Sequence, residues 1–350
     1  MMNPVHESRF LPAGQFGSHL AHLPAGRGYL RNTLSRDAES RIPRENPAYH
    51  FPAPLYLDFI TWWNMGEAEP LLITGPAGSG KTSAVLEFAA RLSVPVVSYT
   101  ARPRMDRREL VGRWVLAPEG GMRWIDGPAA LAWKHGWLLL VNEFSAAPAE
   151  TWVSANDLLE GLPLENDQTG ERIERHPDAR IVFTDNTRGH SSEAEAGYFG
   201  REMQDRSVID RLWHIRFEGL AEDEEAEVLM KEFPPELVHE AGAESAMEVA
   251  RILARAGAET RASSGADALG LRSKTIALSH RVLRRTGTLM LSYIAGRVPE
   301  LHDPVEWSLD CAAGHALDRP VRNALITYMK TVLGTRLAEL RNLRREANHA

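Results

Sequence analysis

Short apolar runs alternate with amphipathic stretches along the middle of the chain. Amphipathic segments such as TSAVLEFAARL (82–92) carry apolar residues at helical spacing, whereas the apolar runs between them have the length of buried strands. These runs occupy positions 71–74, 94–99, 137–141, 180–184 and 212–217. Strands that alternate with helices predict an α/β fold, with a mostly parallel sheet and helices on both faces.

The pattern changes after residue 217. Three later segments carry apolar residues at helical spacing, namely AEDEEAEVLMKEF (221–233), ESAMEVARILARA (244–256) and KTIALSHRVLRRTGTLMLSYIAG (274–296). We therefore expect a smaller, all-helical domain over residues 218–335. Residues 336–350 predict a basic amphipathic helix, on which Leu337 and Leu340 would lie beside Arg341 and Arg344.

The chain before the first apolar run divides into two parts. Residues 1–45 are rich in Gly, Pro, Arg and His and show no sustained period, so we expect an extended or weakly ordered arm. The segment YLDFITWWNM (56–65) instead predicts a short helix that leads into the first strand. The α/β domain is accordingly expected over residues 46–217.

Two stretches inside this domain predict β-hairpins. Residues 112–126, GRWVLAPEGGMRWID, form two short strands around a Pro-Glu-Gly-Gly tip, with Trp114 and Trp124 as cross-strand partners. Residues 162–175 form the second hairpin, around Gln-Thr-Gly. Neither tip combines Lys or Arg with aromatic residues, the pattern that favours nucleic acid.

Composition and charge exclude several classes of protein. Forty basic and 47 acidic residues give a net charge of −7, which argues against a dominant nucleic-acid surface. The single cysteine, Cys311, excludes a disulfide framework and favours a reducing, cytoplasmic setting. Because no apolar stretch reaches about 18 residues, we expect no membrane span.

A glycine-rich loop follows the first predicted strand in LLITGPAGSGKT (71–82). The loop matches GxxxxGK[ST] and precedes a predicted helix, as phosphate binding requires. Lys81 would face the β- and γ-phosphates of ATP, and the hydroxyl of Thr82 would bind Mg²⁺. The residues expected to hold the nucleotide are Gly75, Pro76, Ala77, Gly78, Ser79, Gly80, Lys81, Thr82 and Ser83.

Two later strand ends carry polar residues suited to hydrolysis. WLLLVNEFS (137–145) places Glu143 where a general base would polarise the attacking water. Asn142 stands where an acidic metal ligand is expected; it can bind a metal-bound water but brings no charge, so weaker Mg²⁺ affinity or slower turnover is expected. Asn186 ends ARIVFTDN (179–186) and can orient that water, the alternative being a turn residue.

The order of these motifs, followed by VIDRLWHIRF (208–217) and a helical unit, resembles the AAA+ ATPases. Within them the chain is most similar to the MoxR-type group, particularly the ATPase subunit of aerobic cobaltochelatase and the rubisco-activating Q-type ATPases. The stretches that carry the resemblance lie at 107–145, 158–187, 196–215 and 276–283, within residues 46–335.

The resemblance implies further roles. Arg211 resembles the arginine finger that reaches a neighbouring subunit's nucleotide, and Arg281 resembles the lid arginine that touches the γ-phosphate in its own subunit. The chain would form a hexameric ring and couple ATP hydrolysis to chaperone-like remodelling of a protein partner, with its hairpins facing the centre of the ring. Members of the group often work with a von Willebrand A domain protein, and some serve metal insertion or enzyme activation.

Three alternatives stay open at this stage. A nucleic-acid-linked AAA+ motor would need a basic pore, against which the net charge argues. A P-loop kinase would not need Glu143 at its position. A nucleotide-gated switch that hydrolyses weakly is favoured by Asn142, because the amide lacks the charge that an acidic residue brings to the metal.

Overall fold

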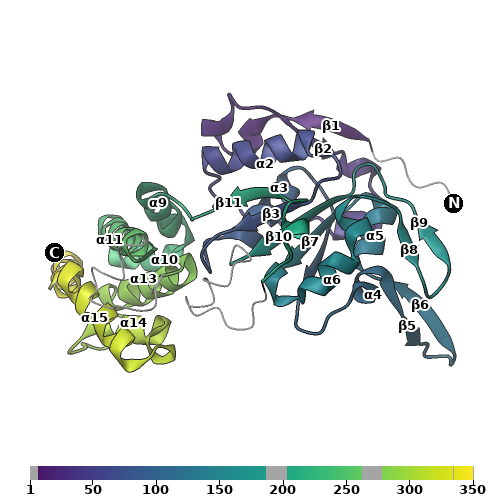
Figure 1. Cartoon of the computed structure of the whole chain (residues 1–350). Coiled ribbons are helices and arrows are strands. Elements are labelled where there is room, and N and C mark those ends of the chain that lie inside the picture. The colour runs from purple at the N-terminus through teal and green to yellow at the C-terminus, as the bar shows by residue number, and fades with distance from the viewer. Residues whose placement is uncertain (1–6, 187–202, 262–277, 334, 350) are drawn as a thin grey trace. The chain divides into compact units, whose positions relative to one another are not determined.

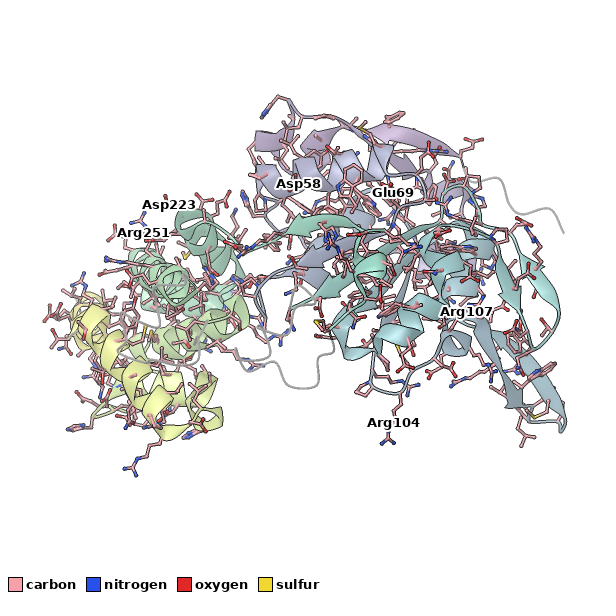
Figure 2. All side chains as sticks on the ribbon, viewed as in Figure 1. Asp58, Glu69, Arg104, Arg107, Asp223 and Arg251 are labelled. Atoms are coloured by element: carbon pink, nitrogen blue, oxygen red, sulfur yellow. The ribbon has the colours of Figure 1, made fainter. Side chains whose placement is uncertain are left out.

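The computed structural model describes residues 7–186, 203–261, 278–333 and 335–349 (Figure 1). The chain divides into two compact units, each considered by itself here. The first comprises residues 1–75 and 80–217, and the second comprises residues 76–79 and 218–350.

A five-stranded parallel sheet forms the centre of the first unit. In spatial order its strands are β11 (Trp213–Arg216), β3 (Leu71–Thr74), β10 (Arg180–Asp185), β7 (Leu138–Asn142) and β4 (Val96–Thr100). The predicted α/β class with a parallel sheet is confirmed. Because all the strands run the same way, the residues after each strand meet at one edge of the sheet.

Apolar cores cover both faces of this sheet. Within β3, Leu71 and Ile73 join one core and Leu72 joins the other, as side chains that alternate along a strand must do. The first core includes residues of α2 (Ala53–Met65) and α3 (Lys81–Arg91). The second core includes residues of α4 (Arg107–Val111), α5 (Pro128–His135), α6 (Ala149–Ser154), α7 (Asn156–Leu159) and α8 (Arg206–Ile209).

The N-terminal segment is folded, which corrects the expectation of an extended or weakly ordered arm over residues 1–45. From residue 7 onward it contains β1 (Ser8–Leu11), η1 (Ala13–Phe16), η2 (Ser18–Leu20), β2 (Gly26–Tyr29), η3 (Arg31–Thr33) and α1 (Arg36–Ser40). Phe16 is buried in the same core as Phe88 of α3, with 5.5 Å between the ring centroids. Buried Arg91, at the end of α3, donates from Nε to the carbonyl of Gln15 at 3.2 Å. The buried apolar residues of this segment are divided among short 3₁₀ turns and other short elements, which have no long sequence period.

Two hairpins extend from the first unit (Figure 1). β5 (Gly112–Leu116) pairs with β6 (Met122–Asp126), and β8 (Leu164–Asn166) pairs with β9 (Glu171–Ile173). In the first hairpin Trp114 lies opposite Trp124 in the register, and the ring centroids are 5.7 Å apart.

The second unit is helical. Its helices are α9 (Glu222–Glu232), α10 (Pro235–Ala241), α11 (Ala243–Arg261), α13 (His280–Ile294), α14 (Pro304–Ala312), α15 (Arg319–Leu333) and α16 (Arg336–His349). They share one apolar core, to which Leu337 and Leu340 of α16 contribute. The basic C-terminal helix therefore packs by its apolar face. Among the described residues, no helix combines the length and the apolar character needed to cross a membrane.

Candidate nucleotide-binding site

The glycine-rich loop connects β3 to α3 and positions a buried lysine. Gly78 and Gly80 have φ values of 73° and 100°, in the left-handed region that favours glycine. Lys81 is the first residue of α3, and its Nζ donates to the carbonyl of Gly75 at 2.8 Å and to Oδ1 of Asn186 at 2.9 Å. The ammonium group is therefore held at the base of the loop, beside the end of β10.

Asn142 is the last residue of β7, and its side chain forms hydrogen bonds with hydroxyl groups of neighbouring elements. Its Oδ1 accepts from Oγ1 of Thr82 at 2.7 Å and from Oγ1 of Thr184 at 3.0 Å, and its Nδ2 donates to Oγ of Ser98 at 3.4 Å. A carboxylate at this position could accept the same two hydroxyl hydrogen bonds. Asn142 thus supplies the acceptor geometry of an acidic residue without its charge.

Glu143 and Asn186 lie next to each other although they follow different strands. Nδ2 of Asn186 donates to Oε2 of Glu143 at 3.3 Å, while Oδ1 of Asn186 accepts from Lys81. A hydrogen-bonded chain therefore runs from Lys81 through Asn186 to Glu143. These are three of the residues that the sequence analysis selected, and the structure brings them together at the carboxyl edge of the sheet.

Asp185 is a neighbour of this chain that sequence reasoning missed. Its side chain is only 2% exposed, and its Oδ1 accepts from the backbone N–H of Ser145 at 3.3 Å and from Oγ of Ser145 at 2.8 Å. An acidic residue directly before Asn186, at the end of an apolar strand, was the available signal. Charged residues are almost never fully buried unless they have partners.

The two arginines that the resemblance selected lie in different units. Arg211 is partly buried between α8 and β11; its Nε donates to Oε1 of Glu160 at 3.0 Å, and its Nη1 donates to the carbonyl of Ser207. Arg281 is exposed in the first turn of α13 in the second unit. The roles of both arginines in catalysis stay predictions.

The residues at the carboxyl edge fit a Mg²⁺–nucleotide complex. Thr82 and Asn142 place two oxygen donors side by side, with the carboxylate of Glu143 on the next residue, and Mg²⁺ prefers oxygen ligands. α3 begins at Lys81, so the dipole of its N-terminus favours negative charge at the loop. A glycine-rich loop, an ammonium group and a helix N-terminus together suit a polyphosphate.

Comparison with known proteins places this site in a family. Residues 70–198 match the AAA domain of the dynein-related subfamily. Among curated relatives, CbbQ from Hydrogenophilus thermoluteolus is 36% identical over 120 residues, which cover 33% of this chain and 44% of CbbQ. NorQ from Paracoccus denitrificans is 33% identical over 143 residues, covering 38% of this chain and 52% of NorQ. The gas vesicle ATPase GvpN from Haloferax mediterranei is 25% identical over 221 residues, which cover 57% of this chain and 61% of GvpN.

The matched stretches span roughly half of the length of these relatives. The predicted resemblance to AAA+ ATPases of the MoxR-type group is confirmed by the domain match and by these relatives. AAA domains bind nucleotide, and the geometry around Lys81 agrees with that activity. Residues 70–198 thus form an AAA domain of the dynein-related subfamily, and the chain is similar to AAA+ relatives of the MoxR-type group.

Proposed function

We propose that this protein hydrolyses ATP with Mg²⁺ and uses the energy to remodel a protein partner. The observation that carries the proposal is the hydrogen-bonded chain Lys81–Asn186–Glu143 beside the Thr82–Asn142 pair. It brings a lysine suited to phosphate close to a carboxylate suited to act as a general base, which supports hydrolysis of a phosphoanhydride by water.

The residues divide the work of this reaction. Lys81 holds the terminal phosphates by charge, and the loop N–H groups orient them. Glu143 accepts a proton from the attacking water, and Asn186 keeps the Glu143 carboxylate directed toward the loop. Thr82 and Asn142 would hold Mg²⁺, which neutralises phosphate charge when bound.

Neighbouring subunits would complete the site in a ring, which we take to be hexameric. Arg211 would supply a cation to the partner subunit's nucleotide, after exchanging its bond to Glu160 for the phosphates. Arg281 would supply a cation from the second unit of its own chain. A fixed positive charge is useful where negative charge develops on the phosphoryl oxygens.

The remodelled partner would be a protein, and remodelling would activate an enzyme or insert a metal. A von Willebrand A domain protein is a candidate for a second protein that acts together with the ring. The hairpin β5–β6 supports a protein partner, because Leu116 and Met122 face each other in the register and are 76% and 59% exposed. Apolar side chains grouped in this way are typical of surfaces that other proteins cover.

ATP binding and turnover test the proposal. Lys81→Ala should abolish ATP binding, whereas the exposed control Lys231→Ala should leave it unchanged. Glu143→Gln should still bind ATP but lose turnover by about 10²- to 10⁴-fold, the usual contribution of a general base. The matched control is Glu150→Gln, which changes an exposed glutamate close by.

Two results would contradict the assignment. Wild-type turnover in Glu143→Gln would remove the proposed base, and unchanged ATP binding in Lys81→Ala would show that the loop holds no phosphate. ATP binding without turnover in the wild-type protein would favour a nucleotide-gated switch over a motor.

A further inference from the structure

The turn that carries Glu143 adopts an uncommon backbone conformation. Glu143 has φ 62° and ψ 45°, which is left-handed, and it immediately precedes a short 3₁₀ turn, η4 (Phe144–Ala146). The left-handed region is costly for residues other than glycine, so such a conformation persists only where surrounding contacts impose it. The direction of the Glu143 side chain therefore depends on what holds this turn.

Residues at and just beyond the end of β10 contact three consecutive residues of this turn, Glu143, Phe144 and Ser145. Asn186 binds the side chain of Glu143, and Asp185 binds both the N–H and the hydroxyl of Ser145. Phe183 packs on Phe144, with ring centroids 4.9 Å apart. Strand β10 and the residue that follows it, Asn186, thus contact each residue of the turn from Glu143 to Ser145.

The Asp185–Ser145 contact is shielded from water. Ser145 is fully buried and Asp185 nearly so. Hydrogen bonds to a carboxylate are stronger than those between neutral groups, and removing one partner leaves the other buried without it. The contact therefore fixes the backbone two residues beyond Glu143.

We propose that Asp185 and Ser145 are positioning residues for Glu143: their buried hydrogen bonds hold the left-handed turn that directs the Glu143 carboxylate toward the attacking water. The inference rests on the proposed function, because it assigns a task to the general base. It adds two residues to the hydrolytic machinery, neither of which touches substrate.

Ser145→Ala tests the pair in the full-length protein. Misplacement of a catalytic group by about 1 Å costs on the order of 100-fold in rate, so we expect kcat to fall roughly 10- to 100-fold. The dissociation constant for ATP should stay unchanged, because the phosphate loop is intact. Ser308→Ala is the matched control, since it removes another fully buried serine hydroxyl, in the second unit. Asp185→Asn keeps an acceptor oxygen for Ser145 and should retain turnover within a few-fold.

The double variant Ser145→Ala/Glu143→Gln separates positioning from general damage. If Ser145 acts through Glu143, adding Ser145→Ala to Glu143→Gln lowers the remaining turnover no further. An equal fold-loss in both backgrounds, or turnover in Ser145→Ala equal to that of Ser308→Ala, overturns the inference. So does an Asp185→Asn variant as slow as Glu143→Gln. Each of these three results would overturn the positioning role but not the proposed function. The proposed function fails if the single variant Glu143→Gln keeps wild-type turnover.

Discussion

His280 begins α13 in the second unit and makes the stability of that unit depend on pH. Its Nδ1 lies 3.2 Å from Oε1 of Glu225, and its Nε2 lies 3.0 Å from Oε2 of Glu232. Glu225 is almost fully buried and also pairs with Arg261 of α11. Burial lowers the pKa of His280, but the hydrogen bonds and negative charges of both glutamates outweigh it and raise the pKa to about 9.

The direction and size of the effect follow from linkage. The pKa of His280 is above its ordinary value of 6.5, so the folded protein holds this proton more tightly than the unfolded chain does. The stabilisation is complete below pH 6.5 and is lost as the pH rises through about 9. Each tenfold change in proton affinity is worth ~1.4 kcal/mol, so the rise in the pKa of His280 from 6.5 to about 9 corresponds to about 3 kcal/mol of stability.

Urea unfolding of the full chain measures this contribution when wild type is compared with His280→Gln at each pH. The difference in unfolding free energy should be largest near pH 6 and should shrink by about 3 kcal/mol toward pH 10. His302→Gln, which replaces an exposed histidine in the same unit, is the control. A difference that stays constant from pH 6 to pH 10 would refute the reasoning, because the stabilisation would then not come from the protonated ring.

Three further variants test other parts of the molecule. Phe16→Ala should lower the unfolding free energy by about 3–5 kcal/mol in urea titrations, because it empties a buried site beside α3; no loss would mean that the N-terminal segment does not pack there. Asn142→Asp should lower the Mg²⁺ concentration for half-maximal ATPase activity, since a carboxylate attracts the ion; an unchanged Mg²⁺ dependence would place the metal elsewhere. Arg211→Ala should abolish turnover while its subunits still bind ATP, and mixing it with Glu143→Gln should restore some activity if Arg211 acts across an interface.

The sheet could be predicted because its three central strands, β3, β10 and β7, are buried on both faces and therefore read as continuous apolar runs. The site followed from the same property. Asn142, Glu143 and Asn186 each stand at or just beyond the end of such a run, and parallel strands bring those ends together. Local sequence was sufficient to predict where a residue lies when that place depends only on the strand that the residue ends.

Residues held by distant partners could not be predicted in this way. Phe16 looks like an isolated apolar residue, and only the fold places Phe88 against it. Asp185 accepts from Ser145, 40 positions earlier in the chain, so from the sequence this buried carboxylate resembled an ordinary polar strand end. No sequence period records contacts of this kind, because they depend on the order of strands within the sheet.

The hydrogen bonds around Asn142 distinguish two possible causes of slow turnover, which are weak Mg²⁺ binding and a displaced general base. A carboxylate in its place would accept the same hydroxyl groups from Thr82 and Thr184, so the amide alters charge while the hydrogen-bond geometry is kept. Loss of that charge would weaken attraction for Mg²⁺. In the proposed mechanism, proton transfer depends instead on Glu143 and on the contacts that hold its turn. Excess Mg²⁺ should therefore compensate for Asn142 but not for a displaced Glu143. A magnesium titration would therefore distinguish a loss of Mg²⁺ affinity at Asn142 from a displaced Glu143.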